Sequence, residues 1–257
     1  MNEFLLTDKT ILITGASSGI GREAALLVSE YGGTVYLTGR DKGRLDETFQ
    51  KISHNPKSQI QDHISRVTRH ASRIFDLTIP SEMDALIADL PPLNGIVHCA
   101  GIVGPIPSKF ITQEEIDKMF SINYNVPVNL TSKILRKKKL LDNASVIFMS
   151  TIATKNPYFG GALYSSSKAA LEAYSKTIAL ELMPKGIRSN CILAGLVDTP
   201  MIVSPAEKGM QEEALGRYLQ RYPLGIGAPK DVAATILFFL SDASKWITGT
   251  NLILGGE

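Results

Sequence analysis

Short apolar runs alternate with longer helical patterns along the whole chain. The runs are rich in Ile, Val and Leu without clear polar alternation, which is typical of strands covered on both faces. The predicted strands are 10–14, 34–37, 73–75, 95–100, 145–149, 188–193 and 251–254. The predicted helices between them are 20–30, 44–52, 81–90, 113–138, 164–183 and 230–240. Ser81 and Thr112 are each followed three residues later by an acid, which predicts capping boxes at two helix starts.

Strict alternation of strands and helices predicts a parallel sheet with helices on both faces. The fold class is therefore α/β, a single doubly wound Rossmann domain over residues 1–257 with a seven-stranded parallel sheet. Two segments interrupt this alternation of strands and helices. Residues 53–69 are polar and predict a surface insertion, and residues 200–222 form a long excursion that predicts a substrate lid.

Composition limits the classes of protein that fit. The chain has 257 residues, 44% hydrophobic and 20% charged, with a formal net charge of +2. This suits one soluble domain and gives no support for nucleic-acid binding. The longest apolar run, 233–240, is too short to span a membrane, and the first residues lack a signal-peptide pattern. We expect a cytoplasmic protein with no nucleic-acid or membrane partner.

The cysteines, histidines and basic residues suggest little special chemistry. Cys99 and Cys191 lie in separate apolar runs, which predicts buried free thiols, and the four histidines show no metal-site spacing. No metal is therefore predicted. The basic run 136–139 is explained as a solvated helix C-terminus favoured by the helix dipole. The alternative is a docking patch for an acidic carrier protein.

A glycine-rich segment, Thr-Gly-Ala-Ser-Ser-Gly-Ile-Gly at 14–21, follows the first predicted strand and opens the first helix. Gly15 permits a tight turn, Gly19 lets the backbone approach a pyrophosphate, and Gly21 lets the helix pack closely on the strand. The free N–H groups at the helix start would hold the phosphate charge. The alternative is an ordinary glycine-rich turn, which the position between strand and helix disfavours. The segment predicts a dinucleotide site.

The end of the second strand carries Gly39 and Arg40. A site that prefers NAD usually has an acid here, which accepts hydrogen bonds from the ribose hydroxyls. A guanidinium instead suits a 2′-phosphate. The alternative is a surface arginine at a strand end. On this position we predict that NADP(H) is preferred over NAD(H).

Tyr164 and Lys168 are four residues apart in a predicted helix and so share one face of it. A positive charge nearby stabilises the phenolate and lowers the tyrosine pKa. The phenol then becomes a proton donor and acceptor near neutral pH. Such a pair also arises by chance on amphipathic helices, so its neighbours in the sequence decide its meaning.

Several further short motifs occur in a specific order and spacing. Together they resemble the short-chain dehydrogenase/reductase family from about residue 8 to residue 256, and most of all its bacterial 3-oxoacyl-[acyl-carrier-protein] reductase branch. The chain length and the Tyr222-Pro223-Leu224-Gly225 stretch both fit that branch. The matching elements are residues 14–21, Asp76-Leu77, Ala100-Gly101, Asn123, Ser150-Thr151, Tyr164 with Lys168, and Val197-Asp198-Thr199.

The resemblance implies hydride transfer between a nicotinamide and a carbonyl or secondary alcohol. Tyr164 would protonate the nascent alkoxide, and Lys168 would lower the Tyr164 pKa and hold the nicotinamide ribose. Asn123 would hold a water that connects Lys168 to solvent, and Thr151, thirteen residues before the tyrosine, would orient the substrate. Taken singly, Asn123 also fits a helix break and Thr151 a strand-end hydroxyl. The implied catalytic residues are Asn123, Thr151, Tyr164 and Lys168.

The resemblance also implies a cofactor site and an assembly. Asp76 and Leu77 would meet the adenine, although Asp76 alone also fits a turn cap, and Val197 and Thr199 would meet the nicotinamide amide. A homo-oligomer, tetramer or dimer, would form through helices 113–138 and 164–183 and strand 251–254. The implied cofactor contacts are Gly15, Ser17, Ser18, Gly19, Ile20, Gly21, Arg40, Asp76, Leu77, Cys99, Ala100, Gly101, Tyr164, Lys168, Val197 and Thr199.

Four departures from the family pattern leave the proton-transfer residues intact. Thr151 replaces the usual serine, and its methyl group restricts the hydroxyl rotamer. His98-Cys99 stands where two asparagines are usual, Ala194-Gly195 replaces Pro-Gly, and Leu254-Gly255-Gly256 replaces Asp-Gly-Gly. These changes weaken the link to fatty-acid synthesis.

The predicted function is NADPH-dependent reduction of a carbonyl to a secondary alcohol. A 3-oxoacyl thioester, free or carrier-bound, is a candidate substrate. One alternative is an NAD-linked dehydrogenase of a sugar or another secondary alcohol. Another class of function, a nucleotide-binding sensor or scaffold without turnover, is disfavoured by the intact Asn123, Tyr164 and Lys168.

Overall fold

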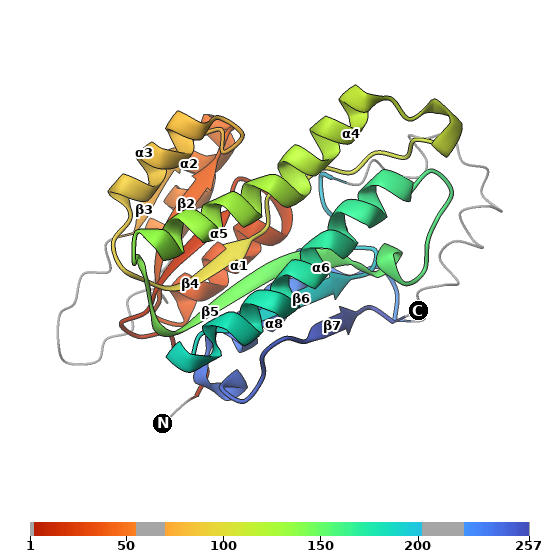
Figure 1. Ribbon diagram of the computed structural model, residues 1–257. Coiled ribbons are helices and arrows are strands. Elements are labelled where there is room, and N and C mark those ends of the chain that lie inside the picture. Colours follow the sequence, from red (N-terminus) through yellow and green to blue (C-terminus); the bar gives the residue numbers. More distant parts are fainter. Residues whose placement is uncertain (1–2, 55–69, 202–223, 257) are drawn as a thin grey trace.

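The protein, described here by a computed structural model for residues 3–54, 70–201 and 224–256, is built on one parallel sheet (Figure 1). The seven strands lie in the order β3-β2-β1-β4-β5-β6-β7. This confirms the predicted doubly wound fold, and strand order reverses between β1 and β4, where such sheets bind ligands. The strands are β1 (Thr10–Thr14), β2 (Thr34–Gly39), β3 (Ala71–Ile74), β4 (Leu93–His98), β5 (Leu140–Thr151), β6 (Arg188–Ala194) and β7 (Asn251–Leu254).

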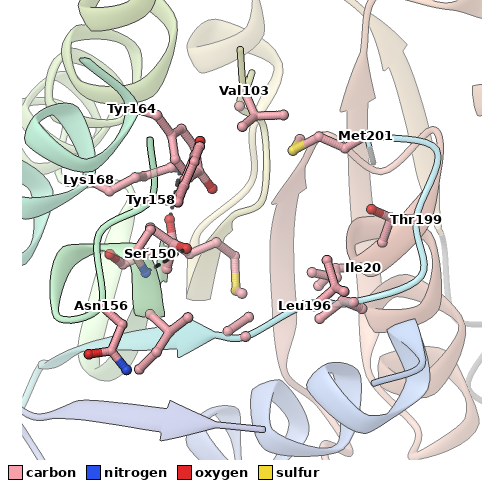
Figure 2. A pocket seen from close by; sticks show the side chains of 18 of the residues that line it. Ile20, Val103, Ser150, Asn156, Tyr158, Tyr164, Lys168, Leu196, Thr199 and Met201 are labelled. Carbon is pink, nitrogen blue, oxygen red and sulfur yellow. Dashed lines mark hydrogen bonds between the residues drawn. The ribbon is translucent and has the colours of Figure 1, made fainter. Parts of the chain in front are cut away.

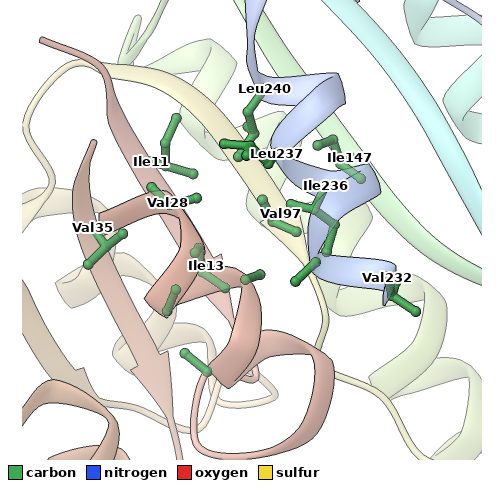
Figure 3. Packing of buried hydrophobic residues seen from close by; sticks show 14 of the residues in the cluster. Ile11, Ile13, Val28, Val35, Val97, Ile147, Val232, Ile236, Leu237 and Leu240 are labelled. Atoms are coloured by element: carbon green, nitrogen blue, oxygen red, sulfur yellow. The ribbon is translucent and has the colours of Figure 1, made fainter. Parts of the chain in front are cut away.

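Helices cover both faces of the sheet, and each face has its own hydrophobic core. Against one face pack α1 (Gly19–Glu30), α2 (Lys42–Ser53) and α8 (Pro229–Leu240). Against the other pack α3 (Pro80–Asp89), α5 (Val126–Arg136) and α6 (Ala162–Leu182). Figure 3 shows Val28 of α1 and Ile236 of α8 directed toward Ile13 and Val97 on the strands. Burial on both faces explains why the strands are apolar throughout.

The predicted helix 113–138 is wrong in its middle. It consists of α4 (Gln113–Phe120), a π-helical turn labelled η3 (Ser121–Asn125), and α5. Asn123, a predicted catalytic residue, lies in the π turn and is fully buried. Single π turns inside α-helices often occur at functional sites.

One of the two predicted capping boxes is confirmed. At the start of α4, Thr112 Oγ1 accepts from Glu115 N at 3.3 Å, and Glu115 Oε2 accepts from Thr112 N at 3.1 Å. The prediction at Ser81 is wrong, because α3 starts one residue earlier, at Pro80. Proline is well suited to the first helical position, so Ser81 falls inside the first turn.

The carboxyl ends of the strands meet at one edge of the sheet. β4 ends at His98, so Cys99 and Ala100 lie just beyond it, and β5 extends to Thr151. The polar insertion predicted for 53–69 falls mostly outside the described residues, as does the predicted lid apart from Pro200 and Met201. Short 3₁₀ turns complete the chain at η2 (Ser108–Phe110), η4 (Ile152–Thr154), η5 (Met183–Lys185) and η6 (Asp242–Ser244). Within the described ranges, no helix combines the length and apolarity needed to cross a bilayer.

Candidate active site

Two adjoining cavities open at the carboxyl edge of the sheet. The larger has a volume of about 810 Å³ and the smaller about 440 Å³. Residues of the loops after β4 and β6, including Cys99, Gly101, Thr199 and Met201, line both. The larger cavity, shown in Figure 2, contains the predicted proton-transfer residues.

The smaller cavity brings together the predicted nucleotide-binding segments. These are the loop after β1, the end of β2, and the segments that follow β3 and β4. The structure also adds Asp41, Arg44, Ile122 and Val126, which sequence reasoning missed. The predicted cofactor residues that line this cavity are Gly15, Ser17, Ser18, Gly19, Ile20, Gly21, Arg40, Asp76, Leu77, Cys99, Ala100, Gly101 and Thr199.

The glycine-rich loop fits a dinucleotide. Gly15 has φ +66°, and a Cβ atom there would lie 2.7 Å from the Ala100 backbone nitrogen. No larger residue could keep the loop this close to the β4 segment. Helix α1 begins at Gly19 in the same cavity lining, so its unpaired N–H groups would hold the pyrophosphate of a dinucleotide. The residues present therefore match a nicotinamide dinucleotide, NAD(H) or NADP(H).

Arg40 and Asp76 lie together in the lining of the smaller cavity. Arg40 Nη1 is 3.8 Å from Asp76 Oδ2, and the arginine side chain is 62% exposed. Asp76 Oδ1 accepts from Thr78 N at 2.9 Å and from Thr78 Oγ1 at 2.6 Å. The Thr78 hydroxyl, with a smaller contribution from Arg40, lowers the Asp76 pKa. Asp76 is thus an ionised turn cap as well as a cavity residue.

Thr151, at the end of β5, is hydrogen-bonded through its side chain to Tyr164 on α6. Burial raises the pKa of Tyr164 to about 12; the Thr151 hydrogen bond lowers it, and the neighbouring Tyr158 phenol raises it further. The net shift is opposite to the lowering predicted from Lys168, because burial outweighs the other effects. Tyr164 is therefore protonated at neutral pH and ready to donate.

Lys168 faces the same cavity from the next turn of α6. Its Nζ donates to the Met149 carbonyl at 2.9 Å, and burial lowers its pKa to about 8. A Cβ atom at Gly101 would lie 3.3 Å from this Nζ and 3.2 Å from Asn123 Oδ1. Glycine at 101 thus leaves room for both polar groups.

Asn123 lies behind the site. Its Oδ1 accepts from Ile102 N at 2.9 Å, and its Nδ2 donates to Ile102 O at 3.0 Å and to Ser167 Oγ at 3.1 Å. It contributes to the lining of neither cavity in the described residues. The side chain fixes the loop after β4 against α6, and the predicted water-holding role stays a prediction.

Glu172 is a buried acid that sequence reasoning missed. Its Oε1 accepts from Ser150 Oγ at 2.7 Å, and its Oε2 accepts from Asn251 Nδ2 at 2.7 Å and lies 3.4 Å from Lys155 Nζ. Glu172 follows Lys168 by one helical turn, as Lys168 follows Tyr164, so this spacing could have revealed it. It holds the β5 end that carries Thr151.

His98 and Cys99, the two substituted residues at the end of β4 and just beyond it, have different surroundings. The His98 ring stacks on Phe148 with ring centroids 4.8 Å apart, and its Nε2 lies 2.9 Å from Thr131 Oγ1. Burial lowers the His98 pKa to about 3, so the ring is neutral. Both cysteines are free thiols, but the prediction that both are buried is wrong for Cys99, which is half-buried.

The last predicted cofactor residues, Val197 and Thr199, line the larger cavity.

The buried ammonium of Lys168 predicts a specific pH dependence of stability. The pKa of Lys168 is about 8 in the folded protein, against its ordinary value of 10.5, so between these pH values the unfolded chain binds more protons than the folded chain. Stability from this group therefore rises with pH in that window. Lys168→Met has no titratable group at this position. Across that window, the free energy of unfolding of the wild type should therefore increase by up to about 3 kcal/mol relative to this variant.

Urea unfolding of both proteins from about pH 7 to about pH 10 measures this difference. Nearby Cys99 and Cys191, whose pKa values burial raises to about 12, are present in both proteins, so their contributions cancel to first order. A difference that stays constant with pH would contradict desolvation of Lys168.

Comparison with known proteins agrees with this geometry. A family model described as enoyl-(acyl carrier protein) reductase matches residues 15–256. The 3-oxoacyl-[acyl-carrier-protein] reductase of Rickettsia felis is 30% identical over 252 residues, covering 98% of this chain and 97% of that protein. Its counterpart in Chlamydia trachomatis is 28% identical over 253 residues, covering 98% of each.

The same architecture occurs in solved structures. A dehydrogenase/reductase from Sinorhizobium meliloti superimposes with a TM-score of 0.86 at 26% identity, covering 99% of this chain and 96% of that one. The fold, the two cavities and the sequence relatives therefore indicate the same family. The chain belongs to the short-chain dehydrogenase/reductase family of oxidoreductases, which act on carbonyl and alcohol groups.

Proposed function

We propose that this protein is an NADP(H)-dependent reductase that converts an uncharged, largely apolar ketone to a secondary alcohol. The observation that carries the proposal is the lining of the larger cavity. Among its described residues, Lys168 is the only charged side chain, and it lies beside Tyr164. Most of the lining is apolar and includes Val103, Pro105, Ile152, Pro157, Leu196 and Met201, with Ser150, Asn156 and Thr199 as uncharged polar residues.

The chain's own residues supply proton transfer and orientation. A bound nicotinamide supplies the hydride. Tyr164 donates its proton to the carbonyl oxygen as negative charge develops there. The Thr151 hydroxyl, already bonded to Tyr164, holds that oxygen close to the phenol. Lys168, positively charged below its pKa of about 8, stabilises the remaining phenolate.

The names of the relatives suggest a substrate class. Bacterial 3-oxoacyl-[acyl-carrier-protein] reductases point to a 3-oxoacyl thioester. A sugar would require many polar contacts, whereas the described cavity wall is largely apolar, so the sugar dehydrogenase alternative is disfavoured.

A substrate panel tests the proposal. Ketones, 3-oxoacyl thioesters and an enoyl thioester would be assayed with NADPH and NADH, and sugars with NADP⁺ and NAD⁺. The enoyl thioester is included because the family model is described as an enoyl reductase. We expect turnover of apolar ketones with NADPH. Cofactor binding without turnover of any carbonyl compound would instead support a sensor or scaffold.

The basic run 136–139 does not suit delivery of a carrier-bound substrate. Arg136, Lys137 and Lys138 are exposed, but they precede Leu140 at the amino end of β5. Thr151 is at the other end of that strand, roughly 35 Å away. A carrier docked on this run would be at the wrong edge of the sheet, so a helix C-terminus is the better explanation.

We also propose that the chain forms a homo-oligomer, a tetramer or dimer, through α6 and β7. Exposed apolar side chains occur on and beside both elements, including Leu180, Trp246 at 96% exposure, and Ile253. Such side chains favour a covered surface. Light scattering at several protein concentrations tests the assembly.

Arg40→Ala tests the cofactor preference. Loss of a charge-assisted phosphate contact should weaken NADPH binding by about 10- to 100-fold and leave NADH binding almost unchanged. Fluorescence titration with both cofactors measures this. Lys42→Ala is the matched control, because it removes a nearby charge that does not line the smaller cavity. Equal losses for both cofactors would make Arg40 a structural residue.

A further inference from the structure

A second tyrosine, Tyr158, forms part of the wall of the larger cavity beside Tyr164. Figure 2 shows the two rings next to one another in the cavity, and the Tyr158 hydroxyl is shielded from solvent. The predicted catalytic set does not include this residue.

A tight turn determines where Tyr158 points. Gly161 N donates to the Tyr158 carbonyl at 3.0 Å, closing a turn over residues 158–161. Gly160, its third residue, has φ +81°, a conformation that glycine adopts readily and other residues avoid. Phe159, the second residue, is 86% exposed. The turn therefore directs adjacent aromatic rings oppositely, Tyr158 into the cavity and Phe159 toward solvent.

The absence of a side chain at Gly161 lets the Tyr158 ring lie against the backbone. A Cβ atom at Gly161 would lie only 2.9 Å from Tyr158 Cε1. Gly161 is also the N-cap of α6, the helix that carries Tyr164. Ile106 N, in the segment after β4, donates to Gly160 O at 2.8 Å. The ring is thus held in place relative to Tyr164.

The two phenols interact electrostatically, since Tyr158 raises the pKa of Tyr164. Both phenols also line the larger cavity, where their rings lie next to one another (Figure 2), so they face a common volume. Tyr164 is hydrogen-bonded to Thr151, and these two side chains account for the reacting carbonyl. The second phenol is positioned for a different oxygen of the same molecule, in a wall whose remaining polar side chains include Ser150, Asn156 and Thr199.

We propose that the Tyr158 hydroxyl donates a hydrogen bond to a second oxygen of the substrate and so selects ketones with another carbonyl close to the reacting one. Esters and thioesters of 3-oxo acids have this arrangement. The inference rests on the proposed ketone reductase activity and identifies the residue that recognises the substrate's second group.

Tyr158→Phe tests the assignment, because it removes only the hydroxyl. Each protein would be assayed on a 3-oxo ester and on a simple ketone of equal chain length without the ester. We expect kcat/KM for the 3-oxo ester to fall about fivefold to tenfold, as for one lost hydrogen bond, and that for the simple ketone to change less than about twofold. Phe159→Ala, in the same turn but exposed, is the control and should change neither.

Gly161→Ala provides an independent variant, since its methyl group displaces the ring while keeping the hydroxyl. It should produce the same selective loss, and it decides the question if Tyr158→Phe does not fold. Equal losses on both substrates, or no loss on either, would overturn the role of Tyr158. Failure of the wild-type protein to reduce either ketone would instead contradict the proposed reductase activity, and the assignment with it.

Discussion

Tyr164→Phe is expected to lower kcat by about 10²- to 10⁴-fold, the usual contribution of a general acid. The phenol is protonated at neutral pH, because burial holds its pKa at about 12, and it faces the larger cavity. Phenylalanine keeps the ring and removes only the donor. Affinity for NADPH should therefore stay nearly unchanged.

Steady-state kinetics on an apolar ketone, together with NADPH titration, measure both quantities. Tyr174→Phe is a matched control, because it removes a phenol from the same helix at a residue that lines neither described cavity. If Tyr164→Phe kept more than about a tenth of the wild-type kcat, another group would have to be the acid.

Thr151 is expected to show the second largest effect. Thr151→Val keeps the branched shape and removes the hydroxyl that is bonded to Tyr164. One lost hydrogen bond to a developing oxyanion typically costs about 10²- to 10³-fold in rate. We therefore expect a loss of this size in kcat/KM for Thr151→Val.

Thr151→Ser is the control, since it keeps the hydroxyl and removes the methyl group. The serine variant should stay active and accept a broader range of ketones. The threonine hydroxyl also accepts from Ala153 N at 3.2 Å, so melting temperatures should be compared to separate folding from orientation. Equal rates for the valine variant and the wild type would leave Tyr164 and Lys168 as the groups acting at the carbonyl.

Most of the sheet could be predicted from the sequence, because strands buried on both faces must be apolar along their length. Helix boundaries depend on more than local sequence. The π turn at residues 121–125 continues a helical pattern, and it coincides with the hydrogen bonds that Asn123 makes to the distant Ile102 backbone. No local pattern encodes such a contact.

Part of the functional site could likewise be predicted from the sequence, and part could not. The glycine spacing and the Tyr164–Lys168 pair identify the two cavities, because in each case the residues that act together lie within a few positions of one another in the sequence. The helical spacing points to Glu172, but its partners Ser150 and Asn251, and the place of Tyr158 in the cavity wall, are set only by folding. The direction of the Tyr164 pKa shift was also inaccessible, since burial is a property of the folded chain.

The π turn changes how this region tolerates the loss of a residue. It holds about one more residue per turn than an α-helix, so its five residues advance the chain through about the same rotation as four residues of α-helix. Deleting one residue in η3 would therefore give a regular helix and leave α5, with the buried Leu130 and Ile134, facing the core much as before. The cost would fall on Asn123, whose hydrogen bonds to Ile102 coincide with the π turn. A lineage could thus shorten this helix by one residue and keep its core, but it would lose this buried contact.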